Sequence, residues 1–388
     1  MSTTSTGSPQ LPAELWLYIQ ALATADYSPV VLANAEWFQY QPHVDPFSQI
    51  RHFWRDARSF SLVNTHWNAL ATDLLYSCVS VDTNGQHFDR LLEILRRGSE
   101  YTVANRVRAI RLSSRRFDWN RTILALCSAS VQVVLLPDVE RFPDLRAVVM
   151  NVPKEPLEGA GIFPALTHIF WTETQTSAGL LGRLLSAAPN LHGMYLTDSS
   201  TALERGTDQI ANLPSAFPSL RNLTLGTLDR LSMQSILAVD CFRRITTLTC
   251  HPNWLTLLPI LPALRTLRLF GSRTTIDFRA LFEICPVVEE ISLDVWNRFL
   301  HPDPQTMQPS RGLQLIRLHS AVTVVRDWSN IQEFFGMLVA PGFPVVQRVV
   351  LHNAWYRVIH DLNFGPVREM LNRSPSEVRI EFPEGRRL

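Results

Sequence analysis

The stretch PALRTLRL, residues 262–269, carries the pattern that decides the fold. Its leucines Leu264, Leu267 and Leu269 follow the spacing apolar-x-x-apolar-x-apolar, and Pro262 stands two residues before the first of them. A proline prevents the preceding helix from continuing and favours an extended conformation in its neighbour. The stretch therefore predicts that a helix ends here and that a short strand begins.

The same spacing returns throughout the chain after residue 100. It begins at Val107, Leu145, Leu166, Leu191, Leu220, Ile245, Leu264, Val288, Leu313 and Val346. Prolines precede many of these starts by two residues: Pro143, Pro164, Pro189, Pro218, Pro262, Pro286 and Pro344. Most intervals fall in or near the period of leucine-rich repeats, about 20–29 residues. With amphipathic stretches between the starts, we expect a mixed α/β chain: an irregular solenoid with a parallel sheet on its concave face.

The composition excludes several classes of protein. Of the 388 residues, 46% are hydrophobic and 18% are charged, which favours a folded chain over a disordered one. The formal net charge is +1, so the chain has no global field that would attract nucleic acid or an anionic membrane. We therefore expect neither nucleic acid nor a membrane as a partner.

The cysteines and the first ten residues indicate the cellular compartment in which the protein is expected. The five cysteines are odd in number and far apart, and no C-x-x-C occurs, which indicates buried thiols in a reducing environment. Residues 1–10 are polar and resemble a disordered tail rather than a secretory signal, and no apolar run is long enough to span a membrane. We expect the cytoplasm or the nucleus.

The N-terminal part, residues 11–82, differs from the repeats at 83–388. LPAELWLYIQALA, residues 11–23, predicts a helix, and residues 26–57 predict a long loop with a short helix at 47–57. SLVNTHWNALATDLLY, residues 61–76, has the apolar period of a second helix. A short strand at 78–83 and an amphipathic helix at 86–98 follow.

These N-terminal stretches resemble an F-box. LPAEL opens the first helix, SLVNTHWNALA forms the second, and LLYSCVSV follows. The layout is similar to F-box proteins with leucine-rich repeats, especially the divergent ones abundant in mushroom-forming fungi. The resemblance implies that both helices dock on the adaptor subunit of a Skp–cullin–F-box ubiquitin ligase, as a helix docks in a groove. The implied adaptor-binding residues are Leu11, Pro12, Leu15, Ile19, Leu62, Val63 and Trp67.

The chain departs from this family in two ways. The inserted residues 26–57 separate helices that an F-box joins by a short turn. The repeats also lack the usual asparagine at the end of each strand, which occurs only as Asn253, so other contacts should hold the strand exits. A second interpretation of Trp67 remains open, in which it packs inside a small helical domain.

The candidate substrate-binding residues lie between the apolar positions of the predicted strands. Alternate residues of a strand point the same way, so these side chains should face the concave surface. Aromatic and arginine side chains are the residue types that anchor protein interfaces, although a solvated sheet without a partner is an equal alternative. The residues are His168, Phe170, Tyr195, His251, Arg268, Phe270, Glu290, Asp294, Arg317, His319, Arg348 and His352.

Three tryptophans follow strands at one rim: Trp254, Trp296 and Trp355. They would form a recognition edge or, as we expect for so large a side chain, pack in the strand-to-helix loops. The proline-rich loop at 294–312 is either a partner-binding loop or tolerated variation.

Catalysis finds no support in the sequence. The eleven histidines are scattered, and neither H-E-x-x-H nor G-x-S-x-G nor a phosphate-binding glycine loop occurs. We therefore expect no metal, no cofactor and no enzyme activity. The expected function is that of a substrate-recognition subunit, which binds the ligase adaptor and a protein substrate of unknown identity. The alternative is an interaction scaffold that acts outside the ligase.

Overall fold

The computed structural model describes a set of separate ranges. They are residues 55, 58–59, 61–62, 68, 75–81, 85–96, 103–113, 116–136, 162–173, 178–198, 217–226, 242–271, 275–294, 298–300, 312–320, 328–339, 346–353, 355–373 and 378–388. The chain divides into two compact units, the first of residues 1–194 and 199–214, the second of residues 195–198 and 215–388. The predicted tail at 1–10 and the predicted helix at 11–23 lie outside the described residues, as does most of the helix at 61–76.

The main structural element is an open parallel sheet of twelve strands, whose order follows the sequence. This confirms the expected mixed α/β class with a parallel sheet. The strands are β1 (Cys78–Ser80), β2 (Ala109–Arg111), β3 (Val133–Leu136), β4 (His168–Glu173), β5 (Gly193–Asp198), β6 (Asn222–Leu225), β7 (Thr247–Cys250), β8 (Thr266–Leu269), β10 (Glu290–Asp294), β12 (Leu315–Ser320), β13 (Arg348–Asn353) and β14 (Arg379–Glu381). A separate parallel pair joins β9 (Thr275–Asp277) to β11 (Arg298–Leu300).

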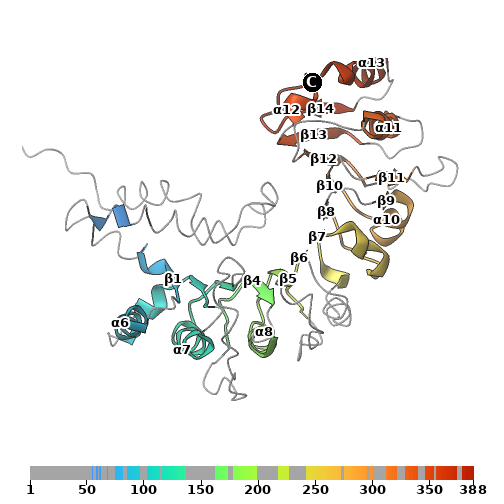
Figure 1. Ribbon diagram of the computed structural model, residues 1–388. Coiled ribbons are helices and arrows are strands. Elements are labelled where there is room, and N and C mark those ends of the chain that lie inside the picture. Colours follow the sequence, from blue (N-terminus) through green and yellow to red (C-terminus); the bar gives the residue numbers. More distant parts are fainter. Residues whose placement is uncertain are drawn as a thin grey trace, which may run out of the picture. The chain divides into compact units, whose positions relative to one another are not determined.

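The described helices connect these strands. Within the first unit α6, α7 and α8 lie along one side of β1–β4, and within the second unit α10, α11 and α13 lie along one side of β8–β14 (Figure 1). The opposite side of each set of strands carries none of these named helices, and it is called the helix-free face below. The helices are α6 (Gly85–Arg96), η2 (Val103–Arg106), α7 (Phe117–Cys127), α8 (Ala178–Ser186), η5 (Phe242–Arg244), η6 (Pro252–Leu257), α10 (Phe278–Ile284), α11 (Trp328–Val339), α12 (Trp355–Val358), η7 (Leu362–Phe364) and α13 (Gly365–Arg373).

In the first unit, one strand was not predicted. Val133 pairs with Ala109 of β2 on one side and with His168 of β4 on the other, so β3 is the neighbour of β4. The predicted strand that begins at Leu145 lies outside the described residues. All four residues of β3 are buried, and such a continuous apolar run lacks the alternation that marks a half-buried strand. The predicted strand at Cys78 is confirmed as β1, and it pairs with β2.

In the second unit, the register is regular. Thr266, Glu290, Leu315 and Arg348 occupy equivalent places on β8, β10, β12 and β13. Arg379 of β14 continues the row, although the sequence pattern had ended with β13. Each predicted start after Leu166 therefore has its strand in the main sheet, and this sheet adds one more strand at its end, β14.

The repeated prolines lie in tight turns rather than simply ending helices. In each described case a buried residue precedes the proline, and its carbonyl accepts a hydrogen bond of 3.2–3.3 Å from the N–H of the first apolar residue of the strand. Proline is favoured at the second position of such a turn because its φ is already set. The turns begin at Phe163, Ala188, Phe217, Leu261 and Cys285.

Backbone hydrogen bonds between successive repeats set the register. The carbonyl of Gln132 accepts from the N–H groups of both Thr167 and His168, at 2.9 and 3.0 Å. In the second unit the carbonyl of Arg265 accepts from Glu289 and Glu290 in the same way, at 2.8 and 2.9 Å. One carbonyl at the entrance of a strand thus fixes two residues of the next strand.

A buried side chain holds the exit of β2, as expected for repeats that lack the usual asparagine. Asn120 of α7 is fully buried. Its Oδ1 accepts a hydrogen bond of 2.8 Å from the N–H of Ser113, and its Nδ2 donates one of 2.6 Å to the carbonyl of Ser113. One amide side chain therefore satisfies both polar groups of a buried backbone unit.

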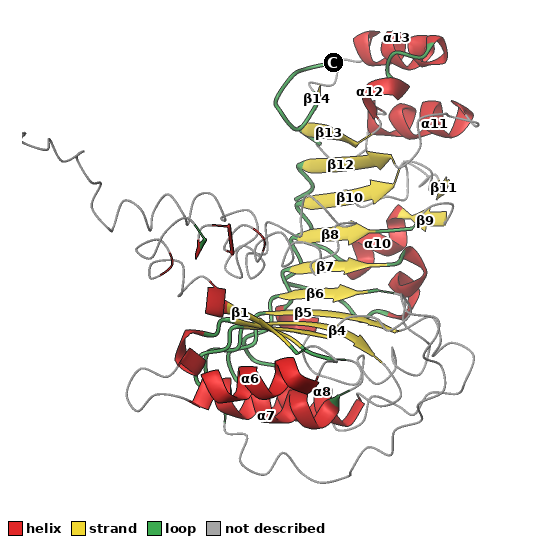
Figure 2. Ribbon diagram, turned by 60° about the vertical axis from the view of Figure 1, so that its left-hand side comes forward, coloured by secondary structure: helices red, strands yellow, loops and turns green. Residues whose placement is uncertain are grey.

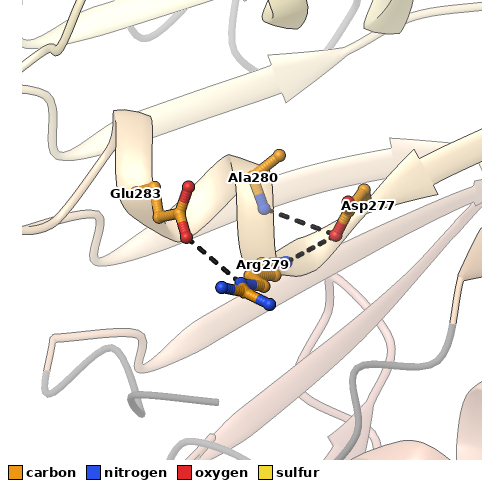
Figure 3. A network of polar contacts seen from close by, with 4 residues as sticks. All are labelled: Asp277, Arg279, Ala280 and Glu283. Carbon is orange, nitrogen blue, oxygen red and sulfur yellow. Dashed lines mark hydrogen bonds and ion pairs between the residues drawn. The ribbon is translucent and has the colours of Figure 1, made fainter. Parts of the chain in front are cut away.

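Helix α10 begins at a side-chain cap. The Oδ1 of Asp277 accepts hydrogen bonds from the N–H groups of Arg279 and Ala280, at 2.9 and 3.3 Å (Figure 3). Aspartate is a preferred residue at this position because it satisfies backbone donors that the helix leaves unpaired. Arg279 in turn pairs with Glu283 one turn later, at 3.2 Å.

Of the three rim tryptophans, Trp355 is fully buried. Its ring meets Phe335 edge-on at 6.0 Å, and Phe335 meets Phe364 in the same way. Packing, the expected role, is therefore confirmed for Trp355. Trp254 is half-buried, and Trp296 lies outside the described residues. None of the helices in the described ranges is both long and apolar enough to cross a membrane.

We predict that Asn120→Ala lowers the free energy of unfolding by about 2 kcal/mol, because it leaves buried backbone groups of Ser113 without partners. Chemical denaturation monitored by circular dichroism measures the change. Thr122→Ala is the control, because its hydroxyl bonds only an exposed carbonyl of the same helix, and its effect should stay within about 0.5 kcal/mol. Equal stability of both variants would contradict the role of Asn120.

Candidate functional site

Most of the predicted adaptor-binding residues lie outside the described ranges: Leu11, Pro12, Leu15, Ile19, Val63 and Trp67. Leu62 is described, and 74% of its surface is exposed. Large apolar side chains exposed to this degree occur at few described positions. Leu62 is therefore accessible within the segment that the F-box resemblance marks for docking.

The predicted substrate-binding residues of the second unit form rows on the helix-free face. Glu290 and Arg348 share one row of the register, while Arg268, Arg317 and Glu381 share the next. A third row contains Asp294, His319 and His352. We call the set Glu290, Arg317, His319, Arg348, His352 and Glu381 the polar strip.

Two ion pairs run diagonally across the polar strip. The Nε of Arg317 lies 2.7 Å from the Oε1 of Glu290 on the neighbouring strand, and both side chains are mostly buried. The Nε of Arg348 donates a hydrogen bond of 2.9 Å to the Oε1 of Glu381 on β14. Because each buried charge has an opposite charge beside it, the strip avoids the large penalty of an isolated buried ion.

Next to the ion pairs, two histidine rings are stacked. The rings of His319 and His352 lie 4.7 Å apart at 17°, and these residues are opposite each other on β12 and β13. Burial, and after it the Arg317 guanidinium, lower the pKa of His352 to about 4, against the opposing effect of the Glu290 carboxylate. His352 is therefore neutral at pH 7.

The expectation of an open surface is wrong for several of these residues. Phe170, Arg268, His319 and His352 are each less than a tenth exposed. The physical reason is the strand spacing of about 4.8 Å, which lets long side chains on adjacent strands cover one another. Arg348 is exposed, and His168, Tyr195, His251, Phe270, Glu290 and Arg317 are intermediate. The side chain of Asp294 is outside the description.

Two other predicted histidines pack against glycines of the following repeat, Gly193 at the start of β5 and Gly271 just after β8. A Cβ atom on Gly193 would collide with the ring of His168, and one on Gly271 would collide with the ring of His251. Burial, helped by His192, lowers the pKa of His168 to about 4. Gly271 also has a φ of 103°, which other residues rarely adopt. These histidines therefore complete the packing between strands.

The sequence pattern missed one member of the polar strip, Glu381. It lies on β14, where VRIEF, residues 378–382, offers alternating apolar residues as the available signal. Its carboxylate completes the pair with Arg348.

The cysteines are as expected where they are described. Cys78, Cys127, Cys250 and Cys285 are free thiols in the core. Burial raises the pKa of Cys127 and Cys285 to about 12, so both are protonated and unreactive at pH 7. The described residues contain no group of three or more His, Cys, Asp or Glu that could hold a metal ion.

Comparison with known proteins adds one similarity. No family model matches the chain. Two curated relatives, both named (3S)-malyl-CoA thioesterase and both from Cereibacter sphaeroides, are 30% identical over 123 residues, which is 31% of this chain. The matched part spans 38% of the length of these relatives.

This similarity corrects one expectation. From the absence of catalytic motifs we expected a protein that is not an enzyme, and the similarity to two curated thioesterases contradicts that expectation. The motifs sought in the sequence were those of metalloproteases, serine hydrolases and phosphate-binding enzymes. A weak likeness spread over 123 residues contains no such short signature and escapes a motif search.

We predict that the unfolding free energy falls as the pH is lowered from about 6.5 to about 4. In this range His352 and His168 remain neutral in the folded chain but take up a proton in the unfolded chain, where the ordinary pKa of 6.5 applies. Proton uptake therefore favours the unfolded chain more and more as the pH falls through this window, and the folded state loses stability. Denaturation midpoints measured at several pH values test the prediction.

His352→Gln should make this dependence shallower, because glutamine takes up no proton. Thr122→Ala, the control variant used above, removes no titratable group and should keep the wild-type slope. Identical slopes for wild type and His352→Gln would show that His352 does not contribute.

Proposed function

We propose that this protein is a substrate-recognition subunit of a Skp–cullin–F-box type ubiquitin ligase. The observation that carries the proposal is the polar strip: a helix-free sheet face on which ordered, paired arginine, glutamate and histidine side chains stand side by side. Such a face offers a partner protein charged contacts, above all at Arg348, whose side chain is 52% exposed. The exposed Leu62, within the F-box-like segment, supports the docking half of the proposal.

The proposal includes the finer architecture. The repeated apolar spacing, the proline turns and the parallel strands support a leucine-rich-repeat solenoid over residues 83–388. Residues 11–82 would form the F-box-like domain, with the insertion at 26–57. The free and buried thiols of the described cysteines support a reducing compartment, and the proposal is the cytoplasm or the nucleus.

In this function the repeats act by positioning. A substrate held on a rigid sheet face near the transfer machinery experiences a high effective concentration of that machinery. Arg348 is the most accessible member of the polar strip, with 52% of its side chain exposed. It is the residue best placed for first contact with a substrate, while the buried pair of Arg317 and Glu290 keeps the face rigid.

The alternative proposal is an interaction scaffold that acts outside the ligase. The same sheet face supports it, because a protein-binding surface needs no adaptor. The two proposals differ only in whether residues 11–82 bind the adaptor, and the following experiment separates them.

We predict that the full chain co-purifies with the ligase adaptor, and that Leu62→Asp, Leu15→Asp and Trp67→Ala each reduce co-purification at least tenfold. An apolar anchor at a helix-in-groove contact cannot be charged or truncated without loss of affinity. Leu362→Asp is the matched control: it changes an equally exposed leucine, 95% accessible, far along the sequence. If the chain fails to co-purify, or if all four variants behave alike, the ligase proposal is wrong and the scaffold stands.

The similarity to thioesterases supports a second candidate function, hydrolysis of a CoA thioester. We predict, for this candidate, that the purified full chain releases free CoA from (3S)-malyl-CoA above the uncatalysed rate, followed with a thiol-reactive dye. Heat-denatured protein is the control. A rate equal to the control would reject this candidate, and adaptor binding would be judged independently.

A further inference from the structure

The turn before β7 departs from the pattern of its neighbours. Phe242 and Ile245, which begin and end it, are buried like the corresponding residues of the proline turns. The two positions between them, elsewhere a proline and a variable residue, are Arg243 and Arg244. Both are exposed, so packing of the sheet does not require arginine at either.

A third arginine joins this turn from the neighbouring strand entrance. The Nη1 of Arg221 donates to the carbonyls of Pro218 and Leu220, at 3.2 and 3.0 Å. The Nη1 of Arg244 donates to the same Pro218 carbonyl, at 3.1 Å. Two exposed guanidinium groups thus converge on one oxygen, and within the described part of the chain neither forms an ion pair.

This arrangement favours an anion. Each guanidinium uses one nitrogen on the backbone, which fixes its orientation and leaves further N–H donors toward solvent. Two like charges held side by side repel each other, and a carboxylate between them would relieve the repulsion and accept from both. Arginine presents its donors as a planar fork that matches a carboxylate.

Apolar side chains lie along the same edge. Strands β6, β7, β8, β10 and β12 point the same way, so the turns at their N-terminal ends line up along one edge (Figure 2). At the turns before β8 and β10, Ile260 is 65% exposed and Val287 is 43% exposed. At the entrances of these same two strands, Arg265 and Glu289 already form an ion pair with each other.

We infer that this edge, formed by Arg221, Arg244, Ile260 and Val287, binds an acidic peptide segment that carries apolar residues beside its carboxylates. The strand spacing sets the scale: from β6 to β10 the edge spans three spacings, about 14 Å, the length of about four extended residues. A peptide offers apolar side chains to Ile260 and Val287, which a nucleic acid or a lipid headgroup does not. The edge is a second surface, separate from the polar strip of the proposed function.

The test is fluorescence polarisation of the full chain with a short labelled peptide of alternating glutamate and isoleucine. We expect saturable binding that weakens with salt, and about tenfold weaker binding to the double variant Arg221→Gln/Arg244→Gln. Arg279→Gln is the matched control, because Arg279 is exposed but pairs with Glu283, and it should bind as wild type. A peptide with glutamine in place of glutamate should bind at least tenfold less tightly.

Two further variants keep the test decisive. Arg221→Lys/Arg244→Lys retains the charge but not the planar fork, so it should bind less tightly than wild type and more tightly than the glutamine double variant, which separates loss of charge from loss of folding. Ile260→Asn should weaken binding about threefold. No binding by the wild-type chain, equal binding by the glutamine double variant, an unchanged affinity of Ile260→Asn, or tighter binding of a single-stranded oligonucleotide than of the peptide would each overturn the inference.

Discussion

One backbone interaction recurs at the entrance of the strands, and the rest of the structure depends on it. A carbonyl just after the first buried apolar residue accepts two N–H groups from the next repeat, as that of Thr246 does from Arg265 and Thr266. This geometry leaves one choice of register between neighbours. A slip of one residue would turn every buried leucine to the opposite face. The buried core and the rows on the helix-free face are therefore consequences of the same bond.

The register explains why the polar strip consists of diagonal pairs. Glu290 and Arg317 are not opposite each other, but the long arginine side chain reaches back across one strand spacing to the carboxylate. His319 and His352 are opposite each other, and their rings stack at the strand spacing. The stacked rings and the buried ion pair beside them hold one another in place, so the side chains of this face are polar and also rigid. Rigidity of this kind suits recognition by shape.

The sequence predicts the strands well where a proline turn precedes them. The starts at Leu166, Leu191 and Leu264 are strand entrances because each apolar residue closes a turn. It does not predict β3, whose four consecutive buried residues offer no alternation, nor β14, which lies beyond Pro344, the last proline of the repeated pattern. The sequence also does not predict which side chains pair. The ion pair between Arg348 and Glu381 depends on the register of two strands that are distant in the sequence. Adaptor docking remains a prediction, since most of its residues lie outside the described part of the chain.

The proline turns have a consequence for how this protein can vary. Their first and last residues are buried and their hydrogen bond is made by the backbone, while the two middle positions face water. Substitution there leaves both the core and the register untouched. The turn before β7, with arginines in place of proline, is one instance of that freedom. Along this edge, substitutions during evolution can therefore change the charge and shape of one repeat at a time, while the sheet stays the same.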